Sequence, residues 1–203
     1  MLSPSFGAGI RSFPMEQRPP NRHGKERHCR LSLRYSLAPH TISETHVRAL
    51  VAYAREYGVE ELTLMVAAED WNDGHLPLDW RHPWWRLLSD VIPTLRRKGF
   101  RIGINPWCTV GHADRGRRPG TDQNFTTMVS PSGRRASMIA SFACLSWQEH
   151  IVQCYQMFAH LRPDVLWLED DFRFHNHPPL DWGDFSEAML ESFSRKLGRP
   201  VSR

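Results

Sequence analysis

The chain has 203 residues, of which 40% are hydrophobic and 11% aromatic, as is typical of one globular domain rather than of a disordered chain. Its formal net charge is +4, and residues 1–30 account for it, because they hold six Arg or Lys residues against two Glu. The remainder is formally neutral, so we expect no nucleic-acid-binding face, and no apolar run reaches membrane-spanning length.

Residues 1–29 are rich in Pro, Arg, Gly and Ser without periodicity, which predicts a disordered basic leader before a folded domain at 30–203. The first residues also lack the charged start and apolar stretch of a secretory signal. The four cysteines are Cys29, Cys108, Cys144 and Cys154. They form no CxxC pair, which argues against a zinc ribbon and a disulfide framework. We therefore expect reduced thiols in a cytoplasmic protein without a metal or cofactor.

The folded part begins with the alternating stretch "RLSLRYSL" at 30–37, which predicts a strand. Thr41 and Glu44 follow at the spacing of a capping box, and the apolar spacing after them predicts a helix that ends at Gly58. The next apolar run, 61–69, has the length of a strand buried on both faces.

Pro83 suits the first position of a second helix, which we expect to end at Gly99. The stretch "FRIGINPW" at 100–107 predicts a third strand. It is followed by a long polar loop, into which "MVSPSGRRASM" at 128–138 is built as a hairpin.

Ser146 and Glu149 form a second capping-box pattern before a helix that closes ahead of Pro163. The apolar run that opens "DVLWLEDDF" at 164–172 predicts the fourth strand, and a last helix is expected at 185–197.

Strands that alternate with helices predict an α/β fold with a parallel sheet. Both a (β/α)8 TIM barrel and an open doubly wound sheet fit this alternation. An open nucleotide-binding sheet is expected to show a glycine-rich turn after its first strand, and "YSLAPHTISE" contains no glycine. We therefore predict a barrel of which about four β/α units are present, a truncated form. Its open edges could pair two copies into a homodimer.

Polar and aromatic side chains cluster where the predicted strands end, which is where active sites form in parallel α/β folds. Three adjacent carboxylates follow the fourth strand and are the predicted catalytic residues, in the order Asp171 or Glu169, then Asp170. The predicted substrate-binding residues are Trp71, Asn72, Asn105, Trp107, His112, Arg173, His175 and His177. Tryptophans would stack on sugar rings, but core packing explains them equally well.

The motifs "AAEDWNDG", "INPWCTVGH", "MVSPSGRRA" and "DVLWLEDDFRFHNH" together resemble the N-terminal half of a family of TIM-barrel glycoside hydrolase-like proteins. The resemblance implies an enzyme that acts on glycosidic bonds of a carbohydrate substrate. It also implies a catalytic acid among the three carboxylates that follow strand four, and a partner carboxylate on a later strand. The chain alone is therefore expected to have incomplete or no activity.

Glycoside hydrolysis needs one protonated and one ionised carboxyl group beside the sugar. Crowded like charges favour protonation of one carboxyl group, and Arg173 would keep another ionised. Two alternatives remain open. One is a metal-dependent barrel hydrolase or isomerase that uses Asp171, His175 and His177. The other is a non-catalytic remnant that binds carbohydrate, in which the carboxylates pair only with neighbouring basic residues.

Overall fold

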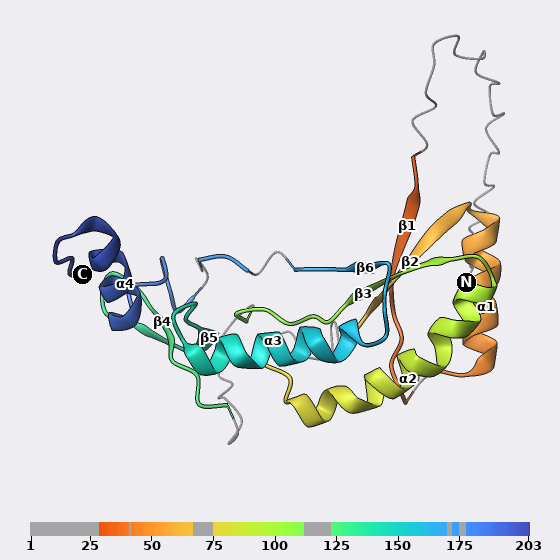
Figure 1. Cartoon of the computed structure of the whole chain (residues 1–203), viewed down its shortest axis with the longest axis horizontal. Coiled ribbons are helices and arrows are strands. Elements are labelled where there is room, and N and C mark those ends of the chain that lie inside the picture. The colour runs from red at the N-terminus through yellow and green to blue at the C-terminus, as the bar shows by residue number, and fades with distance from the viewer. Residues whose placement is uncertain (1–28, 41, 67–74, 112–122, 170–171, 175–177) are drawn as a thin grey trace, which may run out of the picture.

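The computed structural model shows a mixed α/β fold built on a four-stranded parallel sheet (Figure 1). The structure describes residues 29–40, 42–66, 75–111, 123–169, 172–174 and 178–203. The strand order is β1-β2-β3-β6, which is also the order along the chain. The strands are β1 (Leu31–Ser36), β2 (Val59–Met65), β3 (Arg101–Asn105) and β6 (Val165–Leu166).

Three helices connect these strands, and all three contribute to one hydrophobic core on one face of the sheet. They are α1 (Glu44–Glu56), α2 (Leu78–Arg97) and α3 (Leu145–Ala159). Figure 1 shows α2 and α3 side by side beneath β3 and β6. The strands supply alternate residues to this core because successive side chains on a strand point to opposite faces. The core residues on the strands are Leu33, Tyr35, Leu62, Leu64, Ile102 and Ile104.

The other face of the sheet is polar. The register aligns Arg34 with Thr63, and Thr63 with Gly103, so these residues form a row across three strands. Ser32 at the start of β1 donates a hydrogen bond from Oγ to Glu61, at 3.2 Å. Thr63 is fully buried even though it faces away from the helices. Arg34, Thr63 and the pair of Ser32 with Glu61 make this face polar on β1 and β2.

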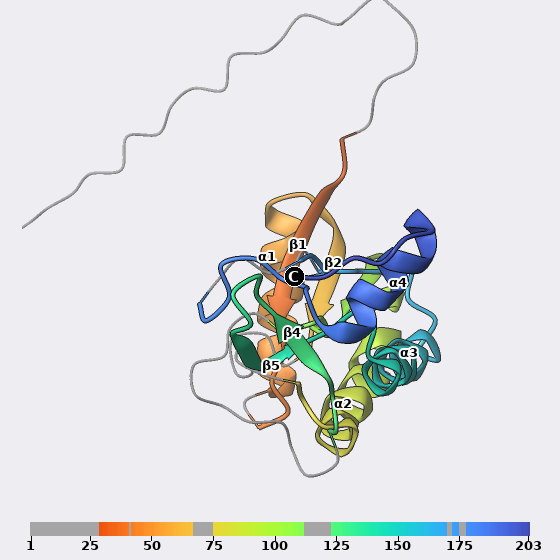
Figure 2. The ribbon, with the colours of Figure 1, turned by 90° about the vertical axis from the view of Figure 1, so that its left-hand side faces the viewer.

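An antiparallel hairpin and a fourth helix lie at the end of the molecule opposite α1 (Figure 1), the end that faces the viewer in Figure 2. The hairpin pairs β4 (Thr127–Val129) with β5 (Arg135–Ala140), which confirms the hairpin predicted around Pro131 and Gly133. It packs with Trp147 of α3 in a second, smaller core. The last helix, α4 (Glu187–Leu197), ends at Gly198 in the left-handed conformation, as the sequence predicts.

The helix starts differ from the predicted ones. The N-cap of α1 is Ser43, whose side chain accepts a hydrogen bond from the backbone N–H of His46, so the capping-box assignment to Thr41 was wrong. Helix α2 begins at Leu78, five residues before Pro83, which lies inside the helix. Helix α3 has Cys144 as its N-cap, and Ser146 instead donates from Oγ to the carbonyl of Asn124. The start of α1 is thus set by a different local cap, whereas Ser146 near the start of α3 is engaged in a tertiary contact instead of a cap.

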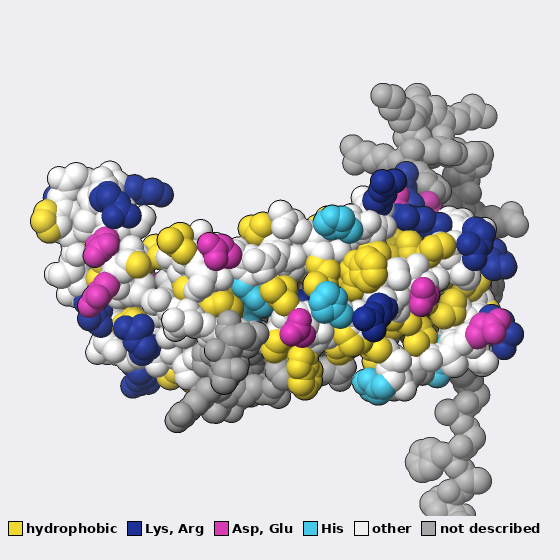
Figure 3. Space-filling model, turned by 60° about the horizontal axis from the view of Figure 1, so that its bottom comes forward, with side chains coloured by type: hydrophobic (Ala, Val, Ile, Leu, Met, Phe, Trp, Pro, Cys, Tyr) yellow, Lys and Arg dark blue, Asp and Glu magenta, His cyan; other side chains and the backbone are white. Residues whose placement is uncertain are grey.

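Within the described ranges, the structure contains no helix with the length and apolar content needed to cross a bilayer. Figure 3 shows the helix side of the molecule, where basic and acidic side chains are interspersed with hydrophobic and histidine side chains. The predicted leader cannot be compared with the structure, because residues 1–28 lie outside the described part.

Candidate functional site

Glu169 lies just beyond β6, at the carboxyl end of the parallel sheet. Its Oε1 accepts hydrogen bonds from Nη2 of Arg34 on β1 and from Nδ2 of Asn105 at the end of β3. The Glu169 side chain is only 11% exposed, whereas that of Arg34 is 45% exposed. Three strands therefore converge on one carboxylate oxygen, and solvent reaches the pair from the arginine side.

Asn105 is fully buried, and its own contacts orient its amide. Its Oδ1 accepts a hydrogen bond from the backbone N–H of Trp107 at 3.0 Å. The amide nitrogen is thereby directed toward Glu169. Trp107 itself has a positive φ of 48°, which is uncommon for a residue other than glycine and is typical of functional sites when the surroundings enforce it.

Trp167 shares the polar face with Glu169, because the two residues are two positions apart along an extended chain. A Cβ added to Gly103 would lie 3.2 Å from Nε1 of Trp167, so the indole lies over this glycine. The Trp167 backbone carbonyl accepts a hydrogen bond from the hydroxyl of Tyr155 at 3.1 Å. Burial raises the pKa of Tyr155, and the charges of Cys108 and Glu169 add to this effect, which keeps that hydroxyl a donor.

In a flat sheet the first and fourth strands lie about 14 Å apart, at roughly 4.8 Å per strand. Side chains stand roughly perpendicular to a sheet. The contact between Arg34 and Glu169 therefore indicates that the sheet curves toward its polar face.

Several predicted site residues lie outside the described residues. They are Asp170, Asp171, Trp71, Asn72, His112, His175 and His177. Their catalytic and substrate-binding roles therefore stay predictions, as does the metal site proposed for Asp171, His175 and His177. Among the described candidates, the structure brings Asn105 and Glu169 into direct contact, with Trp107 bonded to Asn105. Arg173 is described and partly buried. Arg34, which the sequence did not single out, contacts Glu169.

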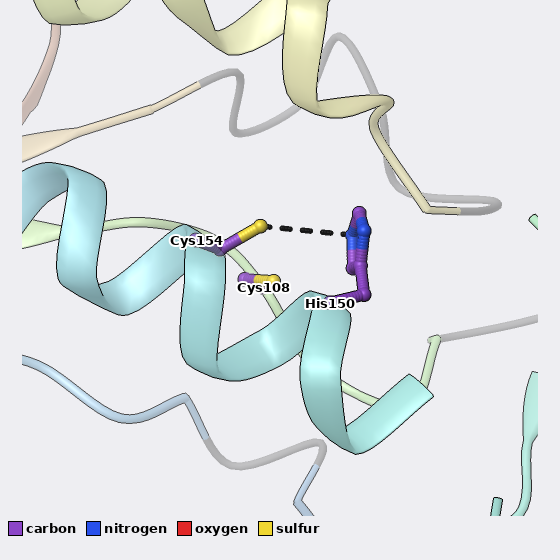
Figure 4. A group of neighbouring side chains, drawn as sticks. All are labelled: Cys108, His150 and Cys154. Atoms are coloured by element: carbon purple, nitrogen blue, oxygen red, sulfur yellow. Dashed lines mark hydrogen bonds between the residues drawn. The ribbon is translucent and has the colours of Figure 1, made fainter. Parts of the chain in front are cut away.

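A second cluster joins Cys108, beyond β3, to His150 and Cys154 on α3 (Figure 4). Their ligand-type atoms all lie within 4.8 Å of one another, and all three residues are buried. Cys154 Sγ lies 3.6 Å from Nε2 of His150. All four cysteines are free in the structure.

Arg81 of α2 is 1% exposed. It donates from Nε to the carbonyl of Leu76 at 3.2 Å and from Nη1 to that of Pro106 at 2.8 Å. Burial alone would raise the pKa of Cys108, but a hydrogen bond from Cys154 and the charge of Arg81 outweigh it and lower that pKa well below its usual value. The pKa of Cys154 is raised because its thiol donates to Cys108 and is itself buried.

His75, just before α2, is also buried and lies near this cluster, with its ring centroid 6.4 Å from that of His150. Its Nε2 lies 2.8 Å from the carbonyl oxygen of Met138, which makes Nε2 the donor. Burial lowers the pKa of His75 to about 4, although the bond to Met138 acts in the opposite direction. The imidazole is therefore neutral at physiological pH.

Sequence reasoning missed the cysteine-histidine cluster and Trp167. The spacing of His150 and Cys154, one helical turn apart, was a usable signal, because residues four apart lie on the same helix face. Nothing in the sequence pairs them with Cys108, which lies more than forty residues earlier. For Trp167, alternation along the strand end would have placed it on the face of Glu169.

Comparison with known proteins gives a likeness of fold. No protein-family model matches the chain, and no curated protein sequence matches it. The structure is similar to that of a beta-galactosidase from the psychrophilic Marinomonas ef1, with a TM-score of 0.50 and 16% sequence identity. The match covers 84% of this chain and 26% of the beta-galactosidase, so the chain spans about a quarter of that protein's length. At this identity the likeness concerns the fold alone.

Proposed function

We propose that the chain is a glycoside hydrolase-like protein whose polar sheet face supplies one side of a site for a carbohydrate. The observation that carries this proposal is the carboxylate of Glu169, held by Arg34 and Asn105 at the carboxyl end of the sheet. The similarity of fold to a beta-galactosidase supports the same class of chemistry.

We also propose that the sheet is part of a (β/α)8 barrel. In a doubly wound sheet the helices cover both faces, whereas here α1, α2 and α3 share one core on one face. The strand order follows the chain order, as in a barrel wall. The bridge from Arg34 to Glu169 favours a sheet that curves around its polar face.

Glu169 is the described carboxyl group to which we assign a chemical role. A nucleophile or a base must be ionised, whereas the acid must hold a proton for the leaving oxygen. The Arg34 guanidinium, a permanent cation, contacts Glu169 and would complement a negatively charged nucleophile or base, so we propose Glu169 for that role. Asp171 and Asp170 remain the proposed candidates for the acid, unless that group comes from another strand.

Substrate contacts would come from the same face. Trp167 and Trp107 offer flat apolar surfaces for the faces of a sugar ring, and both are partly exposed. Aromatic rings bury apolar sugar faces, whereas carboxylates and amides bind the hydroxyl groups. Trp71, Asn72 and His112 would extend this surface if they lie where their strand-end positions predict.

The proposal is tested by binding and turnover with the full chain. We expect a cationic iminosugar, which mimics the charge of the glycosidic transition state, to bind in calorimetric titrations and to lose binding in Glu169→Gln. Any hydrolysis of nitrophenyl glycosides should fall at least about 100-fold in the same variant. Glu60→Gln is the matched control, because Glu60 forms an exposed ion pair with Arg30 at the other end of the sheet.

Equal binding by wild type and Glu169→Gln would contradict the assignment of the site. Failure of the folded wild-type chain to bind any sugar or iminosugar would contradict the carbohydrate function itself.

A further inference from the structure

We propose that Cys108, His150 and Cys154 form a binding site for a zinc ion, which would fasten α3 to the segment beyond β3. The proposal is independent of the carbohydrate function. It rests on the identity of the three side chains, their mutual distances and their place in the fold (Figure 4).

The distances fit tetrahedral coordination. Zinc lies about 2.3 Å from a thiolate sulfur and about 2.0–2.1 Å from an imidazole nitrogen, so the edge between two such ligands of a tetrahedron is roughly 3.6 Å. The observed separation of Cys154 Sγ and His150 Nε2 is 3.6 Å. Cys108 Sγ lies within 4.8 Å of both atoms, so a small rotation of its side chain would complete a three-ligand set.

The ligand types select the metal. Two sulfur atoms and one imidazole nitrogen favour zinc over magnesium or calcium, which prefer oxygen ligands. Cys108 and Cys154 would both bind as thiolates, and the proton that Cys154 donates to Cys108 would pass to solvent, so their two charges would balance that of the divalent ion. The ion and its two thiolates would together carry no net charge, which keeps the cost of burial low.

The framework around the site is already held in place. His150 and Cys154 lie one turn apart on α3 and point to the same side of the helix (Figure 4). The segment that carries Cys108 is fastened on both sides of it. Arg81 donates to the carbonyl of Pro106, and the indole of Trp147 donates to that of Thr109 at 3.0 Å. A bound ion would therefore need little rearrangement of the backbone.

The site has a structural consequence for the polar face. Cys108 lies three residues after Asn105, which contacts Glu169, and one residue after Trp107. An ion at Cys108 would limit the motion of this strand-end segment. Three protein ligands leave one tetrahedral position, which a water molecule would fill.

The first experiment measures metal content. The full chain, purified with a reductant and stripped with a chelator, is dialysed against zinc and analysed by mass spectrometry of the metal. We expect one zinc ion per chain. Cobalt should produce the visible bands of tetrahedral coordination together with sulfur-to-metal charge transfer. Cys108→Ser and Cys154→Ser should lose both signals, whereas Cys144→Ser should keep them, because Cys144 lies outside the cluster.

The second experiment needs no variant, so misfolding cannot obscure it. Zinc should slow the alkylation of Cys108 and Cys154 beyond the protection that burial gives them in the stripped chain, as measured by peptide mass spectrometry, and should leave exposed Cys29 equally reactive in both. Two results would overturn the proposal. One is that folded wild-type chain retains no metal and shows no protection. The other is that a disulfide joins Cys108 to Cys154 in the reduced preparation.

Discussion

Arg34 on β1 donates a hydrogen bond to Glu169, which lies beyond β6 and 135 residues later in the chain. The pair joins the two outer strands of the described sheet across its polar face. It therefore links the curvature of the sheet to the position of the candidate catalytic carboxylate.

We expect Arg34→Met and Glu169→Gln to be coupled in a double-mutant cycle. Because Glu169 is largely buried and Arg34 is partly solvated, the coupling free energy should be about 1 kcal/mol, at the upper end for partly exposed pairs. Urea unfolding of the wild type, both single variants and the double variant measures it.

The matched control for that cycle is Arg30 with Glu60, a pair 3.8 Å apart and more exposed on average. The coupling free energy of this control pair should be near zero. If the two cycles give the same value, the contact between β1 and Glu169 does not form in solution.

Replacing Arg81 with methionine should destabilise the chain by about 3 kcal/mol. The guanidinium is buried and donates to the carbonyls of Leu76 and Pro106, and buried acceptors that lose a charged donor are costly. Thermal or urea unfolding measures the loss. The exposed Arg97 on the same helix is the control, and Arg97→Met should change stability by less than about 0.5 kcal/mol. Equal stability of the two variants would refute the buried position of Arg81.

The stability of the chain should fall in mild acid because of His75. Its folded pKa of about 4 lies below the ordinary value of 6.5, so below pH 6.5 the unfolded chain takes up a proton that the folded chain does not. The contribution of neutral His75 to the free energy of unfolding is therefore fully present above pH 6.5. It is lost as the pH falls from 6.5 to 4, by about 3 kcal/mol in total.

Urea unfolding at several pH values, compared between wild type and His75→Gln, measures that dependence. The variant should show a shallower loss of stability over this interval, whereas replacement of the exposed His82 of α2 should leave the slope unchanged. Identical pH profiles for wild type and His75→Gln would show that His75 is not buried in its neutral form.

Gly103→Ala should cost about 1–3 kcal/mol through overpacking on the polar face. The added Cβ would lie 2.6 Å from Oγ1 of Thr63 and 3.2 Å from Nε1 of Trp167. Combining it with Thr63→Ala removes the closest contact, so the double variant should be more stable than the sum of the two single effects predicts. Strict additivity in chemical unfolding would contradict the close approach of β2 and β3 side chains on this face.

The sequence by itself determined the local elements and their order. The alternating run at 30–37 and the apolar runs at 61–69 and 100–107 overlap β1, β2 and β3, because burial requires the apolar period to match the geometry of a strand. The hairpin and the end of α4 at Gly198 were predicted for similarly local reasons. The carboxylate after the fourth strand was also located in this way.

Only the tertiary structure decided which distant side chains meet. Arg34 as the partner of Glu169, Trp167 over Gly103, and Cys108 beside His150 and Cys154 all join separate elements. Such contacts depend on strand register, sheet curvature and helix packing, which no local pattern contains. For the same reason the starts of α2 and α3 moved from their predicted positions. The apolar periodicity of the sequence predicts whether a segment forms a strand or a helix, whereas tertiary packing determines which side chains come into contact.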